Sequence, residues 1–432
     1  MNTPVAGAPD APKSSCNNPN GFDPEDDRHP LKIPNFRLLW LARMAAVLGG
    51  TAQGAAIAWE VYSLARRHSG VNESAFYLGM FGLSQFVALF CLTIPAGIVV
   101  DRVARKNVMF ITLLLQSILS LVFCAYSMLS DAPIWGLFIL GFIQGGLRAF
   151  IAPATSALGP MLVPRQALPK AVAMNSMSMQ VGSIVGPALG GMLIAISTQA
   201  AYVVCTVMLV LATGLIFLIK ADTRPAAPTG SKTEMVKEGA SFIWKSKLLL
   251  GAMSLDLAAV LLGGATALIP VFSRDVLHVS PFYFGLLQAA TPAGAILMSL
   301  SLSQFPIRRR AGLWMYSCVA IFGVSTIVFG ISRNVWLSIL ALAVLGAVDM
   351  VSVFVRQTLV QIVTPDHMRG RVSSASFLFI GASNQLGEFE SGTVARFIGP
   401  VGAALFGGIG SLLVTLLWIK LFPVLWKADR LE

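Results

Sequence analysis

Ionisable side chains inside otherwise apolar segments are the residues of this sequence that could do chemistry. Residues 384–392 read NQLGEFESG between two apolar runs, so Glu388 and Glu390 lie in a stretch that otherwise avoids water. Six further charged residues also lie within apolar runs: Arg43, Glu60, Arg148, Asp256, Asp349 and Arg356. A charge at the centre of a membrane helix costs about 3 kcal/mol on insertion scales. Each of these residues therefore needs a partner, an aqueous cavity or a role in carrying protons.

Helix geometry separates the two glutamates of this segment. Successive residues are about 100° apart on a helix, so Glu388 and Glu390 point about 200° apart and cannot share a face. Glu388 belongs to a polar stripe at positions i, i+1, i+4, i+7 and i+8, formed by Asn384, Gln385, Glu388, Ser391 and Gly392. We expect Glu388 to face an aqueous path and Glu390 to make a packing contact.

The sequence lacks the usual catalytic and metal-binding patterns. Its four histidines (His29, His68, His278 and His367) fall in tails or between apolar runs, and its five cysteines are far apart. It has no Gly-x-x-x-x-Gly-Lys loop and no paired metal ligands. We therefore expect no enzyme, no metal and no cofactor, and carboxylates as the groups that carry any coupled protons.

The composition is that of an integral membrane protein. Of 432 residues, 56% are hydrophobic and 12% are charged, whereas a soluble domain carries about 25% charged residues. The mean hydropathy is +0.75. The net charge of +11 could indicate a nucleic-acid partner, but the basic residues form short clusters between apolar runs. Positively charged cytoplasmic loops explain that pattern better, so we expect no nucleic acid.

Twelve apolar runs are long enough to cross a bilayer, which takes about 20 residues. They lie near 37–64, 75–100, 108–130, 134–163, 171–198, 200–220, 247–272, 281–304, 312–332, 335–363, 372–397 and 399–423. The predicted fold class is an all-α integral membrane protein with two six-helix halves related by pseudo-twofold symmetry. The predicted domains are a disordered tail (1–36), an N-terminal bundle (37–220), a linker ending in an amphipathic helix (221–246), a C-terminal bundle (247–424) and a second tail (425–432).

Lysine and arginine set the expected orientation. With the N-terminus inside, sixteen of them lie on the cytoplasmic side, and five lie on the outer side: Arg66, Arg67, Arg274, Arg333 and Arg396. The positive-inside rule then predicts that both termini are cytoplasmic. Glu60 lies near the outer end of the first span, where we expect an interfacial position with Trp59 and Tyr62 in an aromatic belt.

The two halves resemble each other when one is shifted by about 201 positions. The shift places Pro164 on Pro365, and it places GPALGG (186–191) on GEFESG (387–392). Arg148 then corresponds to Asp349, and both lie about halfway along their spans. Two six-span halves related in this way are typical of one large class of transporters.

Two motifs carry a resemblance to a known family. GIVVDRVARK, between the second and third spans, resembles the loop motif of the major facilitator superfamily at Gly97, Asp101, Arg102, Arg105 and Lys106, with Ala104 where the family usually has Gly. GSIVGPALGG resembles the fifth-span motif of the drug:proton antiporter branch at Gly182, Gly186, Pro187, Gly190 and Gly191. Residues 148–168 and NQLGEFESG look most like bacterial exporters related to the enterobactin exporter.

Each motif also has a purely structural interpretation. The loop motif could be a solvated positive cluster, although Gly97 and Asp101 together favour a gating contact; the resemblance implies a latch in the outward-open state. Glycines spaced by four residues give a helix face on which another backbone packs closely, and Pro187 permits a kink. Ordinary helix packing would satisfy the same pattern.

The resemblance implies that spans one, four, seven and ten line a central cavity. Arg148 and Asp349 would then face each other across the two halves, either as a static ion pair or as a pair that breaks and reforms during transport. Asp256 is a candidate for proton coupling, with a salt bridge to Arg43 as the alternative. Arg356 and Glu388 complete the set of cavity charges.

The function predicted is export of a small amphipathic organic compound, either drug-like or a siderophore, by alternating access and proton antiport. We expect a monomer in a bacterial cytoplasmic membrane, whose partners are the small-molecule substrate, protons and the lipid bilayer. A proton-coupled importer remains an alternative. A non-transporting receptor or a membrane-embedded enzyme is a more distant one.

Overall fold

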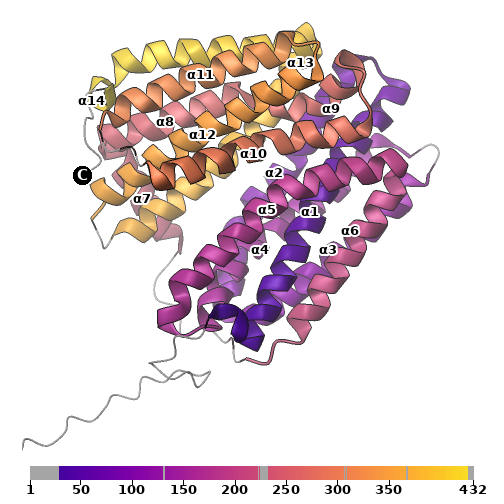
Figure 1. The fold of residues 1–432 in the computed structure, drawn as a ribbon, viewed down its shortest axis with the longest axis vertical. Helices are drawn as coiled ribbons and strands as arrows, with labels where there is room; N and C mark the ends of the chain where they lie inside the picture. The colour runs from indigo at the N-terminus through magenta and orange to yellow at the C-terminus, as the bar shows by residue number, and fades with distance from the viewer. Residues whose placement is uncertain are drawn as a thin grey trace, which may run out of the picture.

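The protein is almost entirely helical (Figure 1). The computed structural model describes residues 29–129, 132–221, 223, 232–305, 307, 309–365 and 368–426. The predicted N-terminal tail lies outside these residues up to position 28, as do residues 222 and 224–231 of the predicted linker and the last six residues. Residues 29–36 hold a short 3₁₀ turn, Pro30–Lys32, and the start of the first long helix.

The first half of the chain forms six long helices. They are α1 (Pro34–His68), α2 (Val71–Arg102), α3 (Arg105–Ser127), α4 (Ile134–Met161), α5 (Leu168–Ile196) and α6 (Thr198–Phe217). Their connections are short, and a side-chain cap starts the last of these helices. Ser197 accepts a hydrogen bond from the amide of Ala200 at the start of α6, which satisfies one of the free N–H groups of a helix N-terminus.

The second half begins with the linker helix α7 (Lys232–Lys245) and then repeats the arrangement. Its long helices are α8 (Lys247–Leu262), α10 (Pro281–Gln304), α11 (Ala311–Ile331), α12 (Val335–Val363) and α13 (Arg369–Leu421), followed by the short α14 (Pro423–Trp426). The span begun by α8 continues through a 3₁₀ segment (Gly264–Leu268), α9 (Ile269–Val271) and a π-helical turn (Phe272–Val276).

The twelve predicted spans are present. Ten helices in the described part of the chain are long and apolar enough to cross a membrane. α1 is not among these ten helices; it carries Arg43 and Glu60 among its apolar residues, and it is the eleventh span. α13 adds another because it is two helices joined at Gly399, whose φ of 79° is a conformation that favours glycine. The chain is therefore a multi-pass membrane protein with the predicted fold class.

The internal repeat is visible in how the helices cross. In the first half, a Cβ on Gly145 of α4 would lie 2.8 Å from the Cα of Gln85 on α2. In the second half, a Cβ on Gly346 of α12 would lie 2.9 Å from the Cα of Thr291 on α10. The shift of 201 positions carries Gly145 to Gly346, so equivalent glycines make equivalent crossings.

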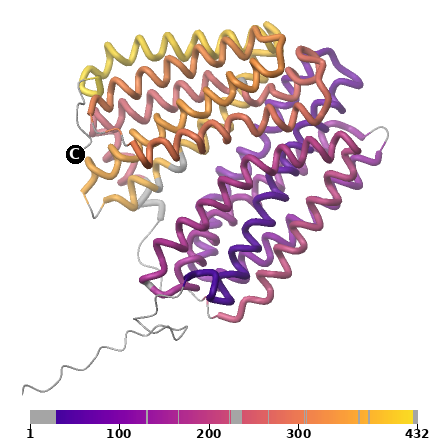
Figure 2. Tube along the Cα trace, viewed as in Figure 1, coloured from indigo at the N-terminus to yellow at the C-terminus, as the bar shows by residue number. Residues whose placement is uncertain are grey.

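The two bundles meet at one end and separate at the other (Figure 2). One buried apolar cluster contains residues of both bundles, such as Tyr62, Leu78, Phe272 and Phe284. At the opposite end each bundle has its own cluster, around Leu158 in the first and around Val355 in the second. We call the shared end, at the right of Figure 2, the closed end, and the other the open end. The start of α1 and α14 both lie at the open end.

The glycine crossings within the bundles predict a stability difference. Gly145→Ala and Gly346→Ala each force a methyl group against the backbone of the neighbouring helix, and should each destabilise the protein by about 1–3 kcal/mol. Gly214→Ala is the matched control, because a Cβ at Gly214 of α6 meets no atom within 4 Å. Thermal unfolding of the purified proteins in detergent measures the effect. Equal midpoints for Gly145→Ala and Gly214→Ala would contradict this packing.

Candidate functional site between the two helix bundles

The crossing of α2 with α13 joins the two bundles through glycine. A Cβ on Gly392 would lie 2.8 Å from the Cα of Gly79 and 2.9 Å from the carbonyl oxygen of Ala75. Real Cβ atoms do not approach that closely, so the two backbones touch here and no larger residue fits. The contact is one of small residues that allow helices to approach closely.

A second glycine crossing, between α5 and α10, also joins the bundles. A Cβ on Gly191 would lie 2.6 Å from the Cα of Gly285, and a Cβ on Gly285 would lie 2.7 Å from the carbonyl oxygen of Pro187. The shift of 201 positions carries Gly191 to Gly392. The two crossings are therefore pseudo-symmetric counterparts, and together they seal the closed end.

The fifth-span motif uses two faces of α5. Added Cβ atoms on Gly182, Gly186 and Gly190 would all meet α1, the last of them 2.8 Å from the carbonyl oxygen of Ala52. The Thr51 hydroxyl of α1 also donates a 2.8 Å hydrogen bond to the carbonyl of Gly182. The glycines spaced by four thus hold α5 against α1 inside one bundle, while Gly191 forms the contact with the other bundle.

A charged cluster lies immediately next to the α2–α13 crossing, on its open-end side. The Glu388 carboxylate packs on Gly82, where an added Cβ would lie 2.7 Å from Oε2. One turn further along α2, the Gln85 side-chain oxygen accepts a 3.2 Å hydrogen bond from Nη1 of Arg148. Arg148 and Glu388 interact electrostatically, and the Arg148 side chain is solvent-accessible. Opposite charges from opposite bundles therefore lie near each other, and one of them, Arg148, is solvent-accessible.

The second charged cluster lies entirely within the C-terminal bundle. Arg356 of α12 and Asp256 of α8 form an ion pair, and both side chains are buried. Asp349 lies two turns before Arg356 on α12 and interacts electrostatically with both members of the pair. Two carboxylates thus share one guanidinium group.

These contacts correct two pairings expected from the sequence. Arg148 hydrogen-bonds Gln85 and interacts electrostatically with Glu388, whereas the charged groups that act on Asp349 are Asp256 and Arg356. Asp256 pairs with Arg356 rather than with Arg43. The buried Nε of Arg43 has no hydrogen-bond partner within the described residues, nor does the buried Oε1 of Gln385.

The two glutamates of α13 have different surroundings. Glu388 faces the neighbouring bundle, whereas Glu390 accepts a 3.3 Å hydrogen bond from the hydroxyl of Ser391 on its own helix. Asn384, one turn from Glu388 toward the open end, is exposed. The polar stripe therefore points Glu388 and Asn384 along the junction between the bundles, as 100° helical spacing requires.

An ion pair between the bundles was not anticipated from the sequence. At the closed end Nη2 of Arg66 on α1 lies 3.0 Å from Oδ1 of Asp275, in the π-helical turn of the other bundle. The Tyr62 hydroxyl donates a 2.5 Å hydrogen bond to Asp275 as well. Trp59 packs on Phe284 of α10, with ring centroids 5.1 Å apart. The aromatic belt expected from Trp59 and Tyr62 is thus wrong: Tyr62 is fully buried, and both residues join the bundles.

The gating-loop residues lie at the open end, inside the N-terminal bundle. Gly97, Asp101 and Arg102 lie in the last turns of α2. Lys106 Nζ donates a 2.5 Å hydrogen bond to the carbonyl of Ile219, just past the end of α6. Nη1 of Arg105 donates a 3.4 Å hydrogen bond to the carbonyl of Ala157 in α4. The loop therefore ties the α2–α3 connection to the ends of α4 and α6.

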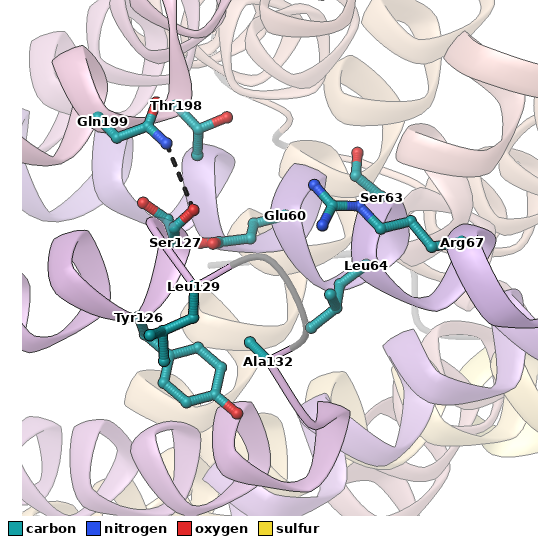
Figure 3. Close-up of a pocket in the computed structure, with 10 residues that line it drawn as sticks. All are labelled: Glu60, Ser63, Leu64, Arg67, Tyr126, Ser127, Leu129, Ala132, Thr198 and Gln199. Carbon is teal, nitrogen blue, oxygen red and sulfur yellow. Dashed lines mark hydrogen bonds between the residues drawn. The ribbon is translucent and has the colours of Figure 1, made fainter.

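A small cavity inside the N-terminal bundle contains Glu60 (Figure 3). Its volume is about 100 Å³, and its polar lining includes Glu60, Ser63, Arg67, Tyr126, Ser127 and Gln199. The Glu60 carboxylate accepts a hydrogen bond from the Tyr202 hydroxyl. Glu60 thus faces the bundle interior rather than the bilayer interface. Within the described residues, no three His, Cys, Asp or Glu side chains gather to hold a metal ion.

Twelve spans in two pseudo-symmetric bundles, with opposite charges meeting between them beside a sealed end, define a membrane transporter rather than an enzyme. The sequence matches the family model described as a transmembrane secretion effector over residues 27–430, and the chain belongs to this family of the major facilitator superfamily. The match spans nearly the whole chain, so both bundles belong to the family fold.

Curated relatives and solved structures agree with this assignment. The chain is 25% identical over 389 residues to the enterobactin exporter EntS of Citrobacter koseri, covering 90% of this chain and 92% of that protein. It is 24% identical over 385 residues to EntS of Escherichia coli O81, covering 89% and 91%. A POT family transporter in complex with a thioalcohol-conjugated peptide has a TM-score of 0.70 at 12% identity, covering 90% of this chain and 96% of that chain.

A second solved structure has the same fold. A bacterial homolog of the human lysosomal transporter Spinster, in an inward-facing and occupied conformation, has a TM-score of 0.67 at 13% identity and covers 92% of this chain and 97% of that chain. At these identities the structural likeness defines the fold alone.

The glycine crossing at the closed end predicts a shift between conformations. Gly392→Ala places a methyl group against the backbone of Gly79 and should destabilise the sealed state by about 1–3 kcal/mol, raising the share of molecules open at that end by roughly tenfold or more. Gly381→Ala, on the same helix where a Cβ meets nothing within 4 Å, is the control.

The readout is the distance between spin labels at Asn72 and Phe397, exposed positions near the closed ends of α2 and α13. Double electron–electron resonance of the full-length protein in nanodiscs should detect a larger long-distance population in Gly392→Ala alone. Identical distance distributions in the two variants would show that this crossing does not seal the transporter.

Proposed function

We propose that this transporter exports a small amphipathic organic compound, such as a siderophore or a drug-like molecule, in exchange for protons. The observation that carries the proposal is the Arg148–Glu388 cluster: opposite charges from the two bundles lie near each other beside a sealed crossing, and the Arg148 side chain is solvent-accessible. The relatives named as enterobactin exporters support the substrate class and the direction.

The proposed mechanism makes the proton and the substrate compete for Glu388. When Glu388 is deprotonated, Arg148 balances its charge, and hydroxyl or amine groups of a substrate can donate hydrogen bonds to the carboxylate. When Glu388 is protonated, its negative charge is lost and one oxygen becomes an O–H donor, so its hydrogen bonds to the substrate weaken. Two ligands that exclude each other at one site, on a protein that opens alternately to each side, produce exchange rather than co-transport.

The remaining polar groups have supporting roles in this proposal. The buried Nε of Arg43 and Oε1 of Gln385, which have no hydrogen-bond partner within the described residues, would reach a substrate only after the helices around them separate. The Asp256–Arg356 pair is neutral, and Asp349 beside it adds a carboxylate with no cation of its own among the described residues, so this cluster is a second place where a proton could be bound. The gating loop (Gly97, Asp101, Arg102, Arg105 and Lys106) would hold the open end shut when the closed end opens.

We also propose the sidedness and the moving parts. The open end carries most of the loop lysines and arginines, so the positive-inside rule places it in the cytoplasm, with both termini on that side of a bacterial cytoplasmic membrane. The bundles 37–220 and 247–424 would move as two bodies about the 221–246 linker. One chain contains both bundles and the whole cluster between them, which supports a functional monomer.

Glu388→Gln tests the coupling. A panel of siderophores and antibiotics first identifies a transported compound with the wild-type protein in inside-out vesicles whose interior is acidified. In proteoliposomes, Glu388→Gln should then lose accumulation driven by the pH gradient, by about tenfold or more. It should keep counterflow exchange of labelled for unlabelled compound at raised concentration, because the amide carbonyl still accepts a hydrogen bond, although a weaker one than the carboxylate. Glutamine keeps the size of the side chain but cannot release a proton.

Glu390→Gln is the matched control, because Glu390 hydrogen-bonds on its own helix, and it should accumulate the compound like the wild-type protein. Unchanged accumulation by Glu388→Gln would assign the proton to another group. Accumulation in right-side-out vesicles only, with protons moving in the same direction, would identify an importer instead.

A further inference from the structure

The linker helix α7 connects the two bundles at the open end. It packs on α13 and α8 of the C-terminal bundle and also reaches α2 of the N-terminal bundle; it lies at the left of the C-terminal bundle in Figure 1. Its inner face is fixed tightly: a Cβ on Gly239 would lie 3.0 Å from the amide nitrogen of Val372, and Ile243 is buried in the core of that bundle. Glu238 forms an ion pair with Arg371 at the start of α13.

The opposite face of α7 is exposed and basic. Lys237, Ser241, Trp244 and Lys245 are all exposed, and their spacing of i, i+4, i+7 and i+8 places them on one side of the helix. The Trp244 side chain is 76% exposed. Between Lys237 and Lys247 the one acidic residue is Glu238, and its carboxylate forms an ion pair with Arg371.

The position of α7 along the membrane normal follows from the chain. α7 ends at Lys245, and α8, which begins a membrane span, starts at Lys247. One residue of connection keeps the end of α7 at the depth where that span enters the bilayer. Tryptophan and lysine are the residues that anchor helices at the lipid headgroups.

We propose that the exposed Lys237–Trp244–Lys245 face of α7, together with Lys247 at the start of α8, binds anionic phospholipid headgroups at the open-end membrane surface. Lysines near such a surface are attracted to it by a salt-sensitive electrostatic force, while Trp244 contacts the upper acyl chains. Because Glu238 and Gly239 attach α7 to the start of α13, the bound lipid steadies the helix that carries Glu388 and Gly392. The inference concerns a different surface from the proposed transport site and does not depend on its substrate or direction.

Quenching of Trp244 fluorescence by brominated lipid tests this directly. Full-length protein is reconstituted in nanodiscs that contain phosphatidylcholine and phosphatidylglycerol, with either one or the other brominated at equal mole fraction. Subtracting the signal of Trp244→Phe isolates Trp244 among the eight tryptophans. Brominated phosphatidylglycerol should quench Trp244 about twofold or more strongly than brominated phosphatidylcholine at low salt, and the difference should fall at high salt.

In a triple variant that combines Lys237→Gln, Lys245→Gln and Lys247→Gln, the two brominated lipids should quench Trp244 fluorescence equally. Lys420→Gln, an exposed lysine near the end of α13, is the matched control and should keep the preference. Equal quenching of wild-type Trp244 by the two lipids would overturn the proposal. So would a preference that survives in the triple variant, or a Trp244 signal that neither lipid quenches.

Discussion

The close crossing of α2 and α13 is the constraint on which the rest of the junction depends. Gly79 and Gly392 bring two backbones into contact, and the carboxylate of Glu388 is thereby held against Gly82 in the opposite bundle. A charge in that position is expensive unless an opposite charge lies nearby. Arg148 supplies it from α4, and Gln85 positions Arg148: its backbone packs against Gly145, and its side chain accepts the Arg148 hydrogen bond.

The pseudo-symmetric crossing has no such charge. At the α5–α10 contact, Pro187 stands where the shift of 201 positions places Glu388, and its carbonyl packs against Gly285. Proline offers packing and a kink but no titratable group. The molecule therefore seals its closed end twice with the same backbone geometry, and at the position that Glu388 occupies beside one crossing the other has a proline. The Arg66–Asp275 pair and the Trp59–Phe284 contact reinforce both from the rim.

Much of this fold follows from the sequence, because hydropathy determines which segments enter a bilayer. The twelve spans, the repeat and the close packing of α5 all follow from apolar run length, Gly spacing and one constant shift. The position of Glu388 on a polar stripe follows from helical periodicity. The partners of the buried charges do not follow, because equivalent positions in two repeats need not face each other. Asp349 corresponds to Arg148 in the alignment, yet the nearer cation for Asp349 is Arg356 on its own helix.

The contacts of Asp275 with Arg66 and Tyr62 at the closed end could not be predicted from the sequence for a related reason. Arg66 and Asp275 are 209 residues apart, and each taken alone resembles an ordinary residue at the end of a span. Tyr62 and Arg66 share one face of α1 at a spacing of four, the one local signal that this face has a polar partner. Which residue of the other bundle meets that face depends on the tilt between the bundles, which local sequence patterns do not encode.

A double-mutant cycle between Arg148 and Glu388 tests the charge pairing at the junction most directly. The unfolding free energies of Arg148→Gln, Glu388→Gln and the double variant are compared with that of the wild-type protein, in the same detergent and at the same pH. If the two charges meet across the bundles, the double variant should lose less than the sum of the single losses, by about 0.5–3 kcal/mol. Strictly additive losses would mean that Arg148 and Glu388 do not interact, and would contradict a junction organised around their pairing.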